Sequence, residues 1–405
     1  MPADDLRLHR RELLVGAAIA GLASALPPMA WAADAPPRVR AKRTLGKTGL
    51  EISDVSFGSS RLRDDEDLVR HALDRGINYF DTAEDYTGGA AETTLGKALR
   101  GKRDRVLLAS KTETAADTPR DALMRALEGS LRRLQTDHVD VYFNHAVNDV
   151  ARLKNPEWHA FVDDAKRQGK IRFVGMSGHA GRLVECLDYA LDTHQVDVIL
   201  VAYNFGQDPA FYEKLLRDFD SIRPQPELPR VLAKAKAEGV GVIGMKTLMG
   251  ARLNDMRPYE TPGGTFAQSA FRWVLSRPDV DALIVSMTSK EQVDEYLGAS
   301  GATRAKRADG ALLGRYAALQ AHAYCRHGCD ACEASCPSGV PIADVLRARM
   351  YAVDYRDAAF GRATYGGLAG SASACLGCSA HACTRVCPHG LPVDRMTVEA
   401  HRLLA

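Results

Sequence analysis

Apolar runs rich in β-branched residues alternate with segments of helical period, and this alternation limits the possible folds more than any other feature of the chain. The helical patterns include 67–75, 122–134 and 228–238. The apolar runs lack a polar face, as expected for strands that are buried on both sides. Eight of them are predicted strands: 54–58, 77–81, 106–111, 139–145, 171–177, 196–204, 240–246 and 282–286.

Eight strand and helix units of similar length predict an α/β fold, a closed (β/α)8 barrel over residues 42–300. An open doubly wound sheet is the alternative. No G-x-G-x-x-G follows the first predicted strand, which disfavours a Rossmann cofactor site.

Four polar residues stand at or just after the ends of three successive predicted strands. They are Asp81, Tyr86, Lys111 and His145. Taken singly, each has a structural explanation: a helix cap, a core tyrosine, a lysine reaching to solvent, and a histidine bonded to a backbone carbonyl. Because barrel chemistry lies where the strands end, together they predict a site at one rim.

This group of side chains suits the transfer of a hydride to a carbonyl. The developing oxyanion needs a proton donor within hydrogen-bond reach, and Tyr86 can supply one. We expect the Lys111 ammonium to lower the pKa of Tyr86, with Asp81 as the counter-charge of Lys111 and His145 orienting the carbonyl oxygen.

The sequence around these residues resembles the aldo-keto reductases. The similar segments are 43–50 (RTLGKTGL), 80–86 (FDTAEDY), 110–112 (SKT) and 169–178 (GKIRFVGMSG). The resemblance implies that Tyr86 is the general acid, that Lys111 and Asp81 tune it, and that His145 positions the substrate carbonyl.

The resemblance also implies a bound NADP(H) or NAD(H). Ser177 would meet the carboxamide, and Tyr203 or Asn204 would lie below the ring. Residues 246–250 would hold the pyrophosphate, and 286–292 would meet the adenosine end. Lys290 is the candidate for the 2′-phosphate. The sequence departs from the family at two positions: Ser286 stands where glycine is frequent, and Tyr296 where an asparagine commonly meets the adenine. Alternatively, Ser177 and Ser286 are polar loop residues without a role in cofactor binding. The full implied set is Ser177, Tyr203, Asn204, Lys246, Gly250, Ser286, Ser289, Lys290 and Gln292.

Eight of the nine cysteines form two similar runs that each end in Cys-Pro, which indicates an internal duplication. The runs contain Cys325, Cys329, Cys332 and Cys336, then Cys375, Cys378, Cys383 and Cys387. They resemble the bacterial ferredoxin run, which implies two [4Fe-4S] clusters, with the last cysteine of each run able to serve the other cluster.

The cysteine runs define a small α-helical ferredoxin-like module over 321–405. Disulfides and zinc are the alternatives for its eight cysteines. A charged connector and an entry helix are expected at 301–320, before the module, and a Gly- and Ala-rich loop at 358–373. Neither is expected to have a chemical role. The ninth cysteine, Cys186, falls in the helical pattern 183–191 and is expected in the core.

The N-terminus reads as an export signal. Arg10 and Arg11 precede the apolar run 13–26 and an Ala-Trp-Ala site at 30–32. This pattern resembles a twin-arginine signal over 1–32, which would engage the twin-arginine export machinery and deliver a folded protein to the periplasm. An amphipathic N-terminal helix and an uncleaved anchor are the alternatives.

Charge and composition narrow the function. Lys and Arg number 53 against 51 Asp and Glu, a net charge of +2 with no dense basic face, so nucleic acid is not expected as a partner. The expected function is an NAD(P)H-dependent oxidoreductase acting on a small carbonyl or alcohol, with substrate choice in loops 61–65 and 207–227. The clusters would relay electrons to a redox partner protein or staple the C-terminus. The alternative is an iron-sulfur electron-transfer or partner-binding protein with an idle barrel.

Overall fold

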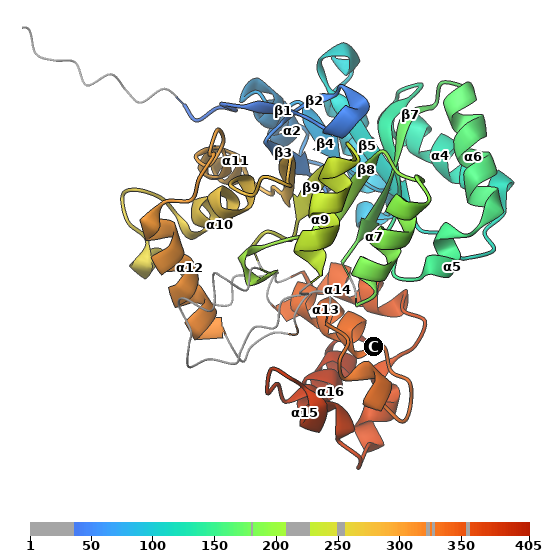
Figure 1. The fold of residues 1–405 in the computed structure, drawn as a ribbon, viewed down its shortest axis with the longest axis vertical. Coiled ribbons are helices and arrows are strands. Elements are labelled where there is room, and N and C mark those ends of the chain that lie inside the picture. Colours follow the sequence, from blue (N-terminus) through green and yellow to red (C-terminus); the bar gives the residue numbers. More distant parts are fainter. Residues whose placement is uncertain are drawn as a thin grey trace, which may run out of the picture. The chain divides into compact units, whose positions relative to one another are not determined.

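A closed barrel of eight parallel strands forms the centre of the structure (Figure 1). The computed structural model describes residues 36–179, 181–207, 227–248, 256–320, 325, 329–353 and 357–405. The hydrogen-bonded order β10-β3-β4-β5-β6-β7-β8-β9 closes on itself and confirms the predicted barrel. Its strands are β3 (Val55–Gly58), β4 (Tyr79–Asp81), β5 (Leu107–Thr112), β6 (Val139–Asn144), β7 (Ile171–Gly178), β8 (Val198–Ala202), β9 (Gly241–Met245) and β10 (Ala282–Ser286).

Helices surround the barrel and bury apolar stripes against the outer faces of the strands. The patterns at 67–75, 122–134 and 228–238 fall on α2, α4 and α9, as predicted. Cys186 is fully buried in α7, also as predicted. The helices are α2 (Glu66–Asp74), α3 (Ala90–Ala98), α4 (Arg120–Leu134), α5 (Val150–Leu153), α6 (Pro156–Arg167), α7 (Leu183–Asp192), α9 (Leu228–Ala237), α10 (Phe266–Leu275) and α11 (Lys290–Leu297).

A short hairpin closes the amino-terminal end of the barrel. It pairs β1 (Lys42–Thr44) with β2 (Glu51–Ser53), and its Leu45, Leu50 and Ile52 pack against the apolar side chains inside the barrel. Gly46 has φ +52, and a Cβ there would lie 2.4 Å from the Gly239 carbonyl oxygen. Only glycine fits this contact, which holds the hairpin on the barrel.

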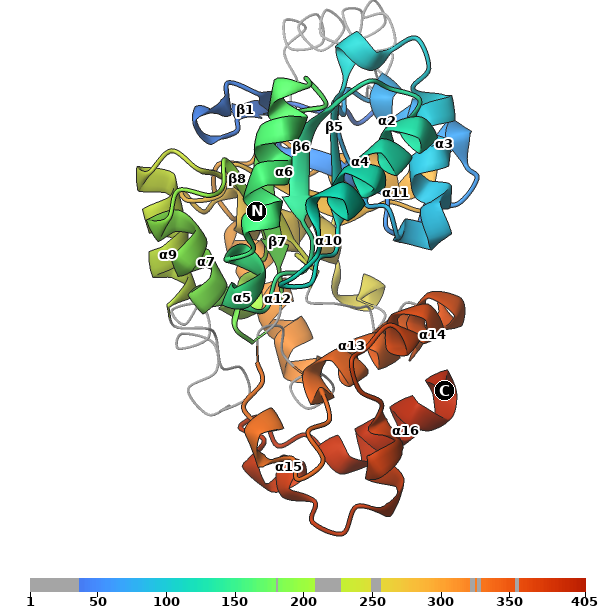
Figure 2. The ribbon, with the colours of Figure 1, turned by 90° about the vertical axis from the view of Figure 1, so that its right-hand side faces the viewer.

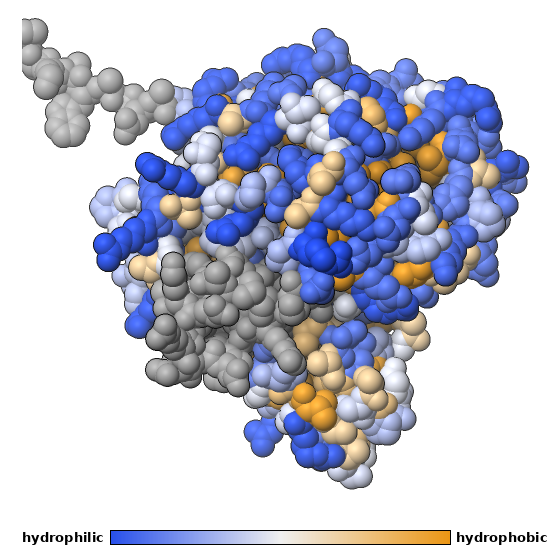
Figure 3. All heavy atoms as spheres, viewed as in Figure 1, coloured by the Kyte–Doolittle hydropathy of each residue, from blue (hydrophilic) through white to orange (hydrophobic). Residues whose placement is uncertain are grey.

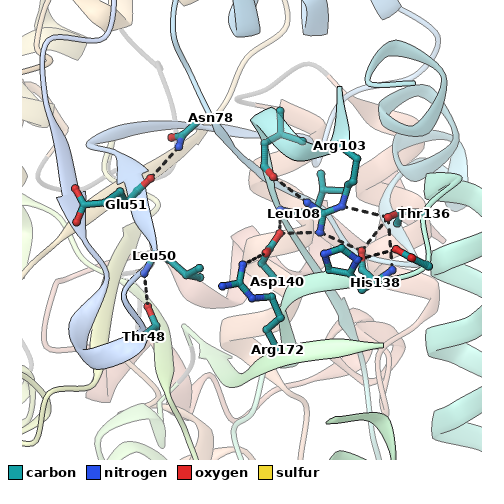
Figure 4. A network of polar contacts seen from close by, with 12 residues as sticks. Thr48, Leu50, Glu51, Asn78, Arg103, Leu108, Thr136, His138, Asp140 and Arg172 are labelled. Atoms are coloured by element: carbon teal, nitrogen blue, oxygen red, sulfur yellow. Dashed lines mark hydrogen bonds and ion pairs between the residues drawn. The ribbon is translucent and has the colours of Figure 1, made fainter. Parts of the chain in front are cut away.

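Buried charge fixes the same end of the barrel. The carboxylate of Asp140, at the start of β6, accepts bonds from Arg103 Nη2 at 2.8 Å, Arg172 Nη1 at 2.6 Å and the Leu108 amide at 2.9 Å (Figure 4). This network ties three neighbouring strand starts together and lies at the end opposite to the predicted chemistry. In a barrel of this kind, polar residues at the amino-terminal end serve stability.

After the barrel the chain continues into α12 (Arg307–Gln320), which docks on α10 through the buried pair Arg272 and Asp309, with Arg272 Nε 2.9 Å from Asp309 Oδ2. Four more helices follow in the C-terminal region, and Figure 2 shows α13, α14 and α16 close together there. They are α13 (Ile342–Val353), α14 (Ala358–Gly366), α15 (Ala382–Val386) and α16 (Val393–Leu404).

The predicted loop at 358–373 is wrong in its first half, because α14 occupies Ala358–Gly366. The Asp357 side chain caps this helix by accepting from the Phe360 amide at 3.0 Å. Gly361 faces α13, where a Cβ would lie 2.9 Å from the Cβ of Ala352. The glycine therefore permits close packing of two helices, a use that composition alone does not separate from a loop.

Surface polarity differs between the two regions. Figure 3 shows hydrophilic residues over most of the barrel on the face drawn, with apolar residues more frequent toward the C-terminal helices. None of the described helices is long and apolar enough to cross a membrane. The predicted signal 1–32, Gly250 and most of the 207–227 loop lie outside the described residues.

Candidate active site

The four predicted catalytic residues line one cavity of about 820 Å³ at the carboxyl-terminal ends of the strands. Asp81 ends β4, Lys111 lies near the end of β5, and His145 directly follows β6. Tyr86 begins a short 3-10 turn, Tyr86–Gly89, after β4. The structure thus brings together all four side chains that the strand ends predicted.

Lys111 and Asp81 form a buried ion pair at the base of this cavity. Lys111 Nζ donates to Asp81 Oδ1 at 2.6 Å and to the Thr82 carbonyl oxygen at 2.6 Å. Both side chains are almost fully buried. Asp81 Oδ2 has no hydrogen-bond partner among the described residues. The pair therefore holds the ammonium in a fixed place.

The Lys111 ammonium lies 4.9 Å from the centre of the Tyr86 ring. The expected lowering of the Tyr86 pKa is nevertheless wrong for this structure. Burial, and then the carboxylates of Asp81 and Asp85, raise the pKa of Tyr86 well above its usual value. The positive charge of Lys111 is already offset by Asp81, so burial prevails. Tyr86 is therefore held as a neutral phenol that can donate a proton.

His145 is held as a neutral imidazole. Burial, followed by the positive charges of Lys111, Arg152 and Lys246, lowers its pKa well below the usual value. Its ring meets the Tyr86 ring edge to face, with centroids 5.7 Å apart. His145 Nδ1 is 3.8 Å from Asp85 Oδ1 and makes no hydrogen bond within the described part of the chain. A neutral imidazole beside the phenol can donate a hydrogen bond from its N–H to a carbonyl oxygen.

Four of the predicted cofactor residues line the same cavity: Ser177, Lys246, Ser286 and Gln292. The Ser177 hydroxyl accepts from the Ala146 amide at 2.9 Å, and the Ser286 and Ser60 hydroxyls are 2.5 Å apart. Lys246 follows β9 with φ +55. Tyr296 also lines the cavity, although it is largely buried against Phe271.

The other predicted cofactor residues take different places. Tyr203 packs in the core against Trp273, with ring centroids 5.4 Å apart, and Asn204 bonds to the Gly206 amide and the Lys246 carbonyl oxygen. Ser289 caps α11, and Lys290 is exposed beside it. Met245, the last residue of β9, lines the cavity, whereas the predicted Tyr203 and Asn204 do not. An apolar methionine at a strand end gives no chemical signal.

The wall of the cavity contains residues that the sequence analysis gave no role. Asp344, Arg347 and Tyr351 of α13 line it, together with Phe360, Ala363 and Thr364 of α14. Tyr351 accepts a hydrogen bond from Lys246 Nζ at 3.0 Å. Arg61 and Arg63, after β3, face Asp357 at 3.8 and 3.9 Å. The C-terminal helices thus complete the cavity that the barrel begins.

The cysteines of the C-terminal region fall into two groups. Burial raises the pKa of Cys332, and the nearby sulfurs of Cys325, Cys329 and Cys387 raise it further. For Cys375 the sulfurs that act in this way are those of Cys336 and Cys378. Each group thus takes the last cysteine of the other run.

In the part of the module that the structure describes, six of these cysteines form no disulfide: Cys332, Cys336, Cys375, Cys378, Cys383 and Cys387. Within the described residues, no three His, Cys, Asp or Glu side chains form a site for a metal ion. Cys336, Cys375, Cys378 and Cys383 surround a second cavity of about 790 Å³. A cubane binds its four thiolates on four different irons, so its ligands stand farther apart than those of one ion.

Comparison with known proteins covers the barrel. L-galactose dehydrogenase of Arabidopsis thaliana is 28% identical over 297 residues, which cover 64% of this chain and 87% of that protein. YrpG, an uncharacterized oxidoreductase of Bacillus subtilis, is 35% identical over 308 residues, covering 63% of this chain and 89% of that protein.

Solved structures agree with this result. An aldo/keto reductase from Klebsiella pneumoniae in complex with NADP and acetate is 25% identical and covers 69% of this chain and 95% of its own, with a TM-score of 0.53. An aldo-keto reductase from Bacillus halodurans, at 24% identity and a TM-score of 0.52, shows the shared fold over 68% of this chain and 95% of its own. The profile of the Aldo/keto reductase family matches residues 45–264, and the chain belongs to that family.

Proposed function

We propose that this protein is an NADP(H)-dependent oxidoreductase that interconverts a small carbonyl compound and its alcohol. The observation that carries the proposal is the buried Lys111–Asp81 pair at 2.6 Å, beside the neutral phenol of Tyr86 and the neutral imidazole of His145 in one cavity. A neutral phenol at that position is the proton donor that a reduced carbonyl needs.

Each residue has a distinct task in this proposal. Tyr86 donates its proton to the carbonyl oxygen during reduction and takes it back during oxidation. Lys111 fixes a positive charge near the phenolate that remains, and Asp81 keeps that ammonium charged in a buried place. His145 donates a hydrogen bond to the carbonyl oxygen and orients it.

The cavity has a lining that fits a nicotinamide cofactor, which when bound supplies or accepts the hydride. Lys246 is a cation whose hydrogen-bond partner here is a phenol, so it can turn to a pyrophosphate. Ser177 and Gln292 offer polar groups toward the two ends of the cofactor. The Klebsiella relative, which contains NADP, supports the choice of cofactor. Lys290, exposed at the start of α11, is the candidate for the 2′-phosphate.

We further propose that residues 321–405 form a ferredoxin-like module that holds two [4Fe-4S] clusters. One set of ligands is Cys325, Cys329, Cys332 and Cys387, and the other is Cys336, Cys375, Cys378 and Cys383. The grouping of the sulfurs around Cys332 and Cys375 supports this division. The clusters either pass electrons to a partner protein or hold the module together.

The twin-arginine pattern supports export of the folded protein to the periplasm after removal of residues 1–32. NADP(H) would then have to be bound before export and kept. Exported protein that carries no nicotinamide, and has no affinity for it, would contradict this part of the proposal.

One experiment separates the enzyme from an electron carrier with an idle barrel. The full chain is purified anaerobically, its iron, sulfide and extracted nicotinamide are measured, and aldehyde reduction is compared between the wild type and Tyr86→Phe. If the protein is an enzyme, Tyr86→Phe should lower kcat by about 100-fold or more, which is the usual contribution of general-acid catalysis. Its cluster absorbance should stay unchanged. Equal carbonyl reduction by both proteins, or none by the wild type with any aldehyde, would overturn the proposal.

A further inference from the structure

The C-terminal helix α13 presents one polar face to the cavity that holds the catalytic residues. Asp344, Arg347 and Tyr351 are spaced three and four positions apart, so they lie on one side of the helix, and all three line the cavity. Tyr351 contacts Lys246 after β9, and Arg347 Nη2 is 3.5 Å from the His179 carbonyl oxygen after β7. The face therefore spans the strand ends from β7 to β9.

Arg347 is the residue of this face that lacks a full set of partners. Its exposed fraction is 7%, and its Nε has no hydrogen-bond partner among the described residues. Nη1 donates to Asp344 Oδ1 at 2.5 Å, while the Nη2 contact at 3.5 Å is at the outer limit of a hydrogen bond. Leaving a charged donor buried and unsatisfied is costly, which indicates that a ligand completes the site.

The open side of Arg347 has the shape of a carboxylate site. Nε and Nη2 form one edge of the guanidinium, and an edge of this kind binds both oxygens of a carboxylate through two parallel hydrogen bonds. Asp344 occupies the Nη1 corner and thereby fixes the direction of the free edge. The carboxylates of Asp85 and Glu113 line the same cavity and would repel a phosphate dianion more strongly than a single negative charge.

The position of Arg347 assigns this edge to the substrate. His179 follows Ser177 by two residues at the end of β7, whereas Ser286 and Gln292, the residues proposed for the adenosine end, belong to β10 and α11. His145, which would orient the carbonyl, lies after the neighbouring strand β6. Arg347 thus contacts the end of β7, the strand beside β6, and not β10 or α11.

We propose that Arg347 is a specificity-determining residue that binds a carboxylate on the substrate, so that the protein acts on oxo acids or hydroxy acids in preference to neutral carbonyl compounds. The conversion of these acids rests on the proposed function, whereas the binding of their carboxylate to Arg347 does not. The C-terminal module then selects the substrate that the barrel converts.

The test compares two aldehydes that differ in charge but little in size, 4-formylbenzoate and 4-formylbenzamide, together with the shorter pair 4-oxobutanoate and 4-oxobutanamide. The full chain should prefer an acid over its amide by about 10- to 100-fold in kcat/KM, the range expected for a hydrogen bond to a charged group. Arg347→Leu should abolish this preference through a higher KM for the acid, and Arg347→Lys should restore part of it.

Arg349→Leu is the matched control, because Arg349 lies on the same helix but pairs with Glu399, with Nε 3.0 Å from Oε2, away from the cavity. It should keep the preference for the acid. Calorimetric binding of the two acids to wild type and variants separates the two proposals. Acid binding that depends on Arg347 without turnover would refute the proposed function alone. Turnover with equal kcat/KM for acid and amide, or an Arg347→Leu effect on the KM for NADPH alone, would overturn the role of Arg347.

Discussion

The Lys111 ammonium and the Asp81 carboxylate are 2.6 Å apart, and both are buried beneath the proposed proton donor. Removal of either partner leaves the other charge buried without compensation. We predict that Asp81→Asn and Lys111→Met each lower the free energy of unfolding by about 3–5 kcal/mol. The double variant should regain much of that loss but remain inactive. Urea unfolding and aldehyde reduction measure both effects, and additive losses would contradict the pairing.

The phenol of Tyr86 should stay protonated throughout the working pH range, because burial and the carboxylates of Asp81 and Asp85 raise its pKa. The chemical step of carbonyl reduction should therefore show no decline from pH 6 to 9 caused by loss of the tyrosine proton. Single-turnover reduction across this range is the measurement. The opposite result would be a wild-type rate that falls above neutral pH, with a midpoint that moves when a positive charge is added near Tyr86. It would show that the Lys111 ammonium lowers the pKa of the phenol.

His145 should make the fold sensitive to mild acid. Its pKa in the folded protein is well below that of the unfolded chain, so the unfolded state binds more protons as the pH falls through about 6.5. Stability from this group is therefore complete above that pH and is lost below it, by at most about 1.4 kcal/mol per pH unit.

His145→Gln should remove this loss of stability in mild acid. Thermal unfolding between pH 7 and 5 should then show a smaller fall in Tm for the variant than for the wild type. Parallel curves would mean that the imidazole is already protonated in the folded protein.

Lys246 donates to Tyr351 at 3.0 Å, and the same ammonium is proposed to hold the cofactor pyrophosphate. Lys246→Met should raise the Kd for NADPH by about 10- to 100-fold, since it removes a charge-assisted contact. Tyr351→Phe should lower that Kd a few fold, because Lys246 then has no hydrogen bond to a phenol to give up before it binds the pyrophosphate. Fluorescence titration of NADPH gives both values, and a weaker Kd in Tyr351→Phe would indicate that the phenol supports the cofactor.

The division of the cysteines predicts which variants resemble one another. Cys387→Ser and Cys329→Ser should both disrupt the same cluster, and Cys378→Ser the other. Each variant should retain about four of about eight iron atoms per chain. The reduced forms of Cys387→Ser and Cys329→Ser should give matching electron paramagnetic resonance spectra that differ from that of Cys378→Ser. A match between Cys387→Ser and Cys378→Ser would refute the exchange of last cysteines.

The strands and the meeting of the four proposed catalytic side chains could be predicted from sequence, because both depend on local pattern. Continuous apolar runs identify buried strands, and a parallel barrel brings every strand end to one rim. Asp81, Lys111 and His145 therefore meet although the first and the last are 64 positions apart in the sequence. The reasoning needed only the order of the strands.

The wall of the cavity could not be predicted in this way. Arg347 and Tyr351 reach the site because α13 docks on the barrel, and no periodicity within α13 specifies that docking. The predicted lowering of the Tyr86 pKa is wrong for a related reason. Its sign depends on how far Asp81 offsets Lys111 and on the depth of burial, which are three-dimensional quantities.

The division of labour along the chain also has a consequence for biosynthesis. Residues 81–145, with all four proposed catalytic groups, leave the ribosome before the wall supplied by α13 and α14 is synthesised. A nascent or truncated chain without α13 and α14 would carry these groups in a cavity that lacks one wall. Docking of α13 and α14 therefore completes a cavity whose other residues were synthesised much earlier.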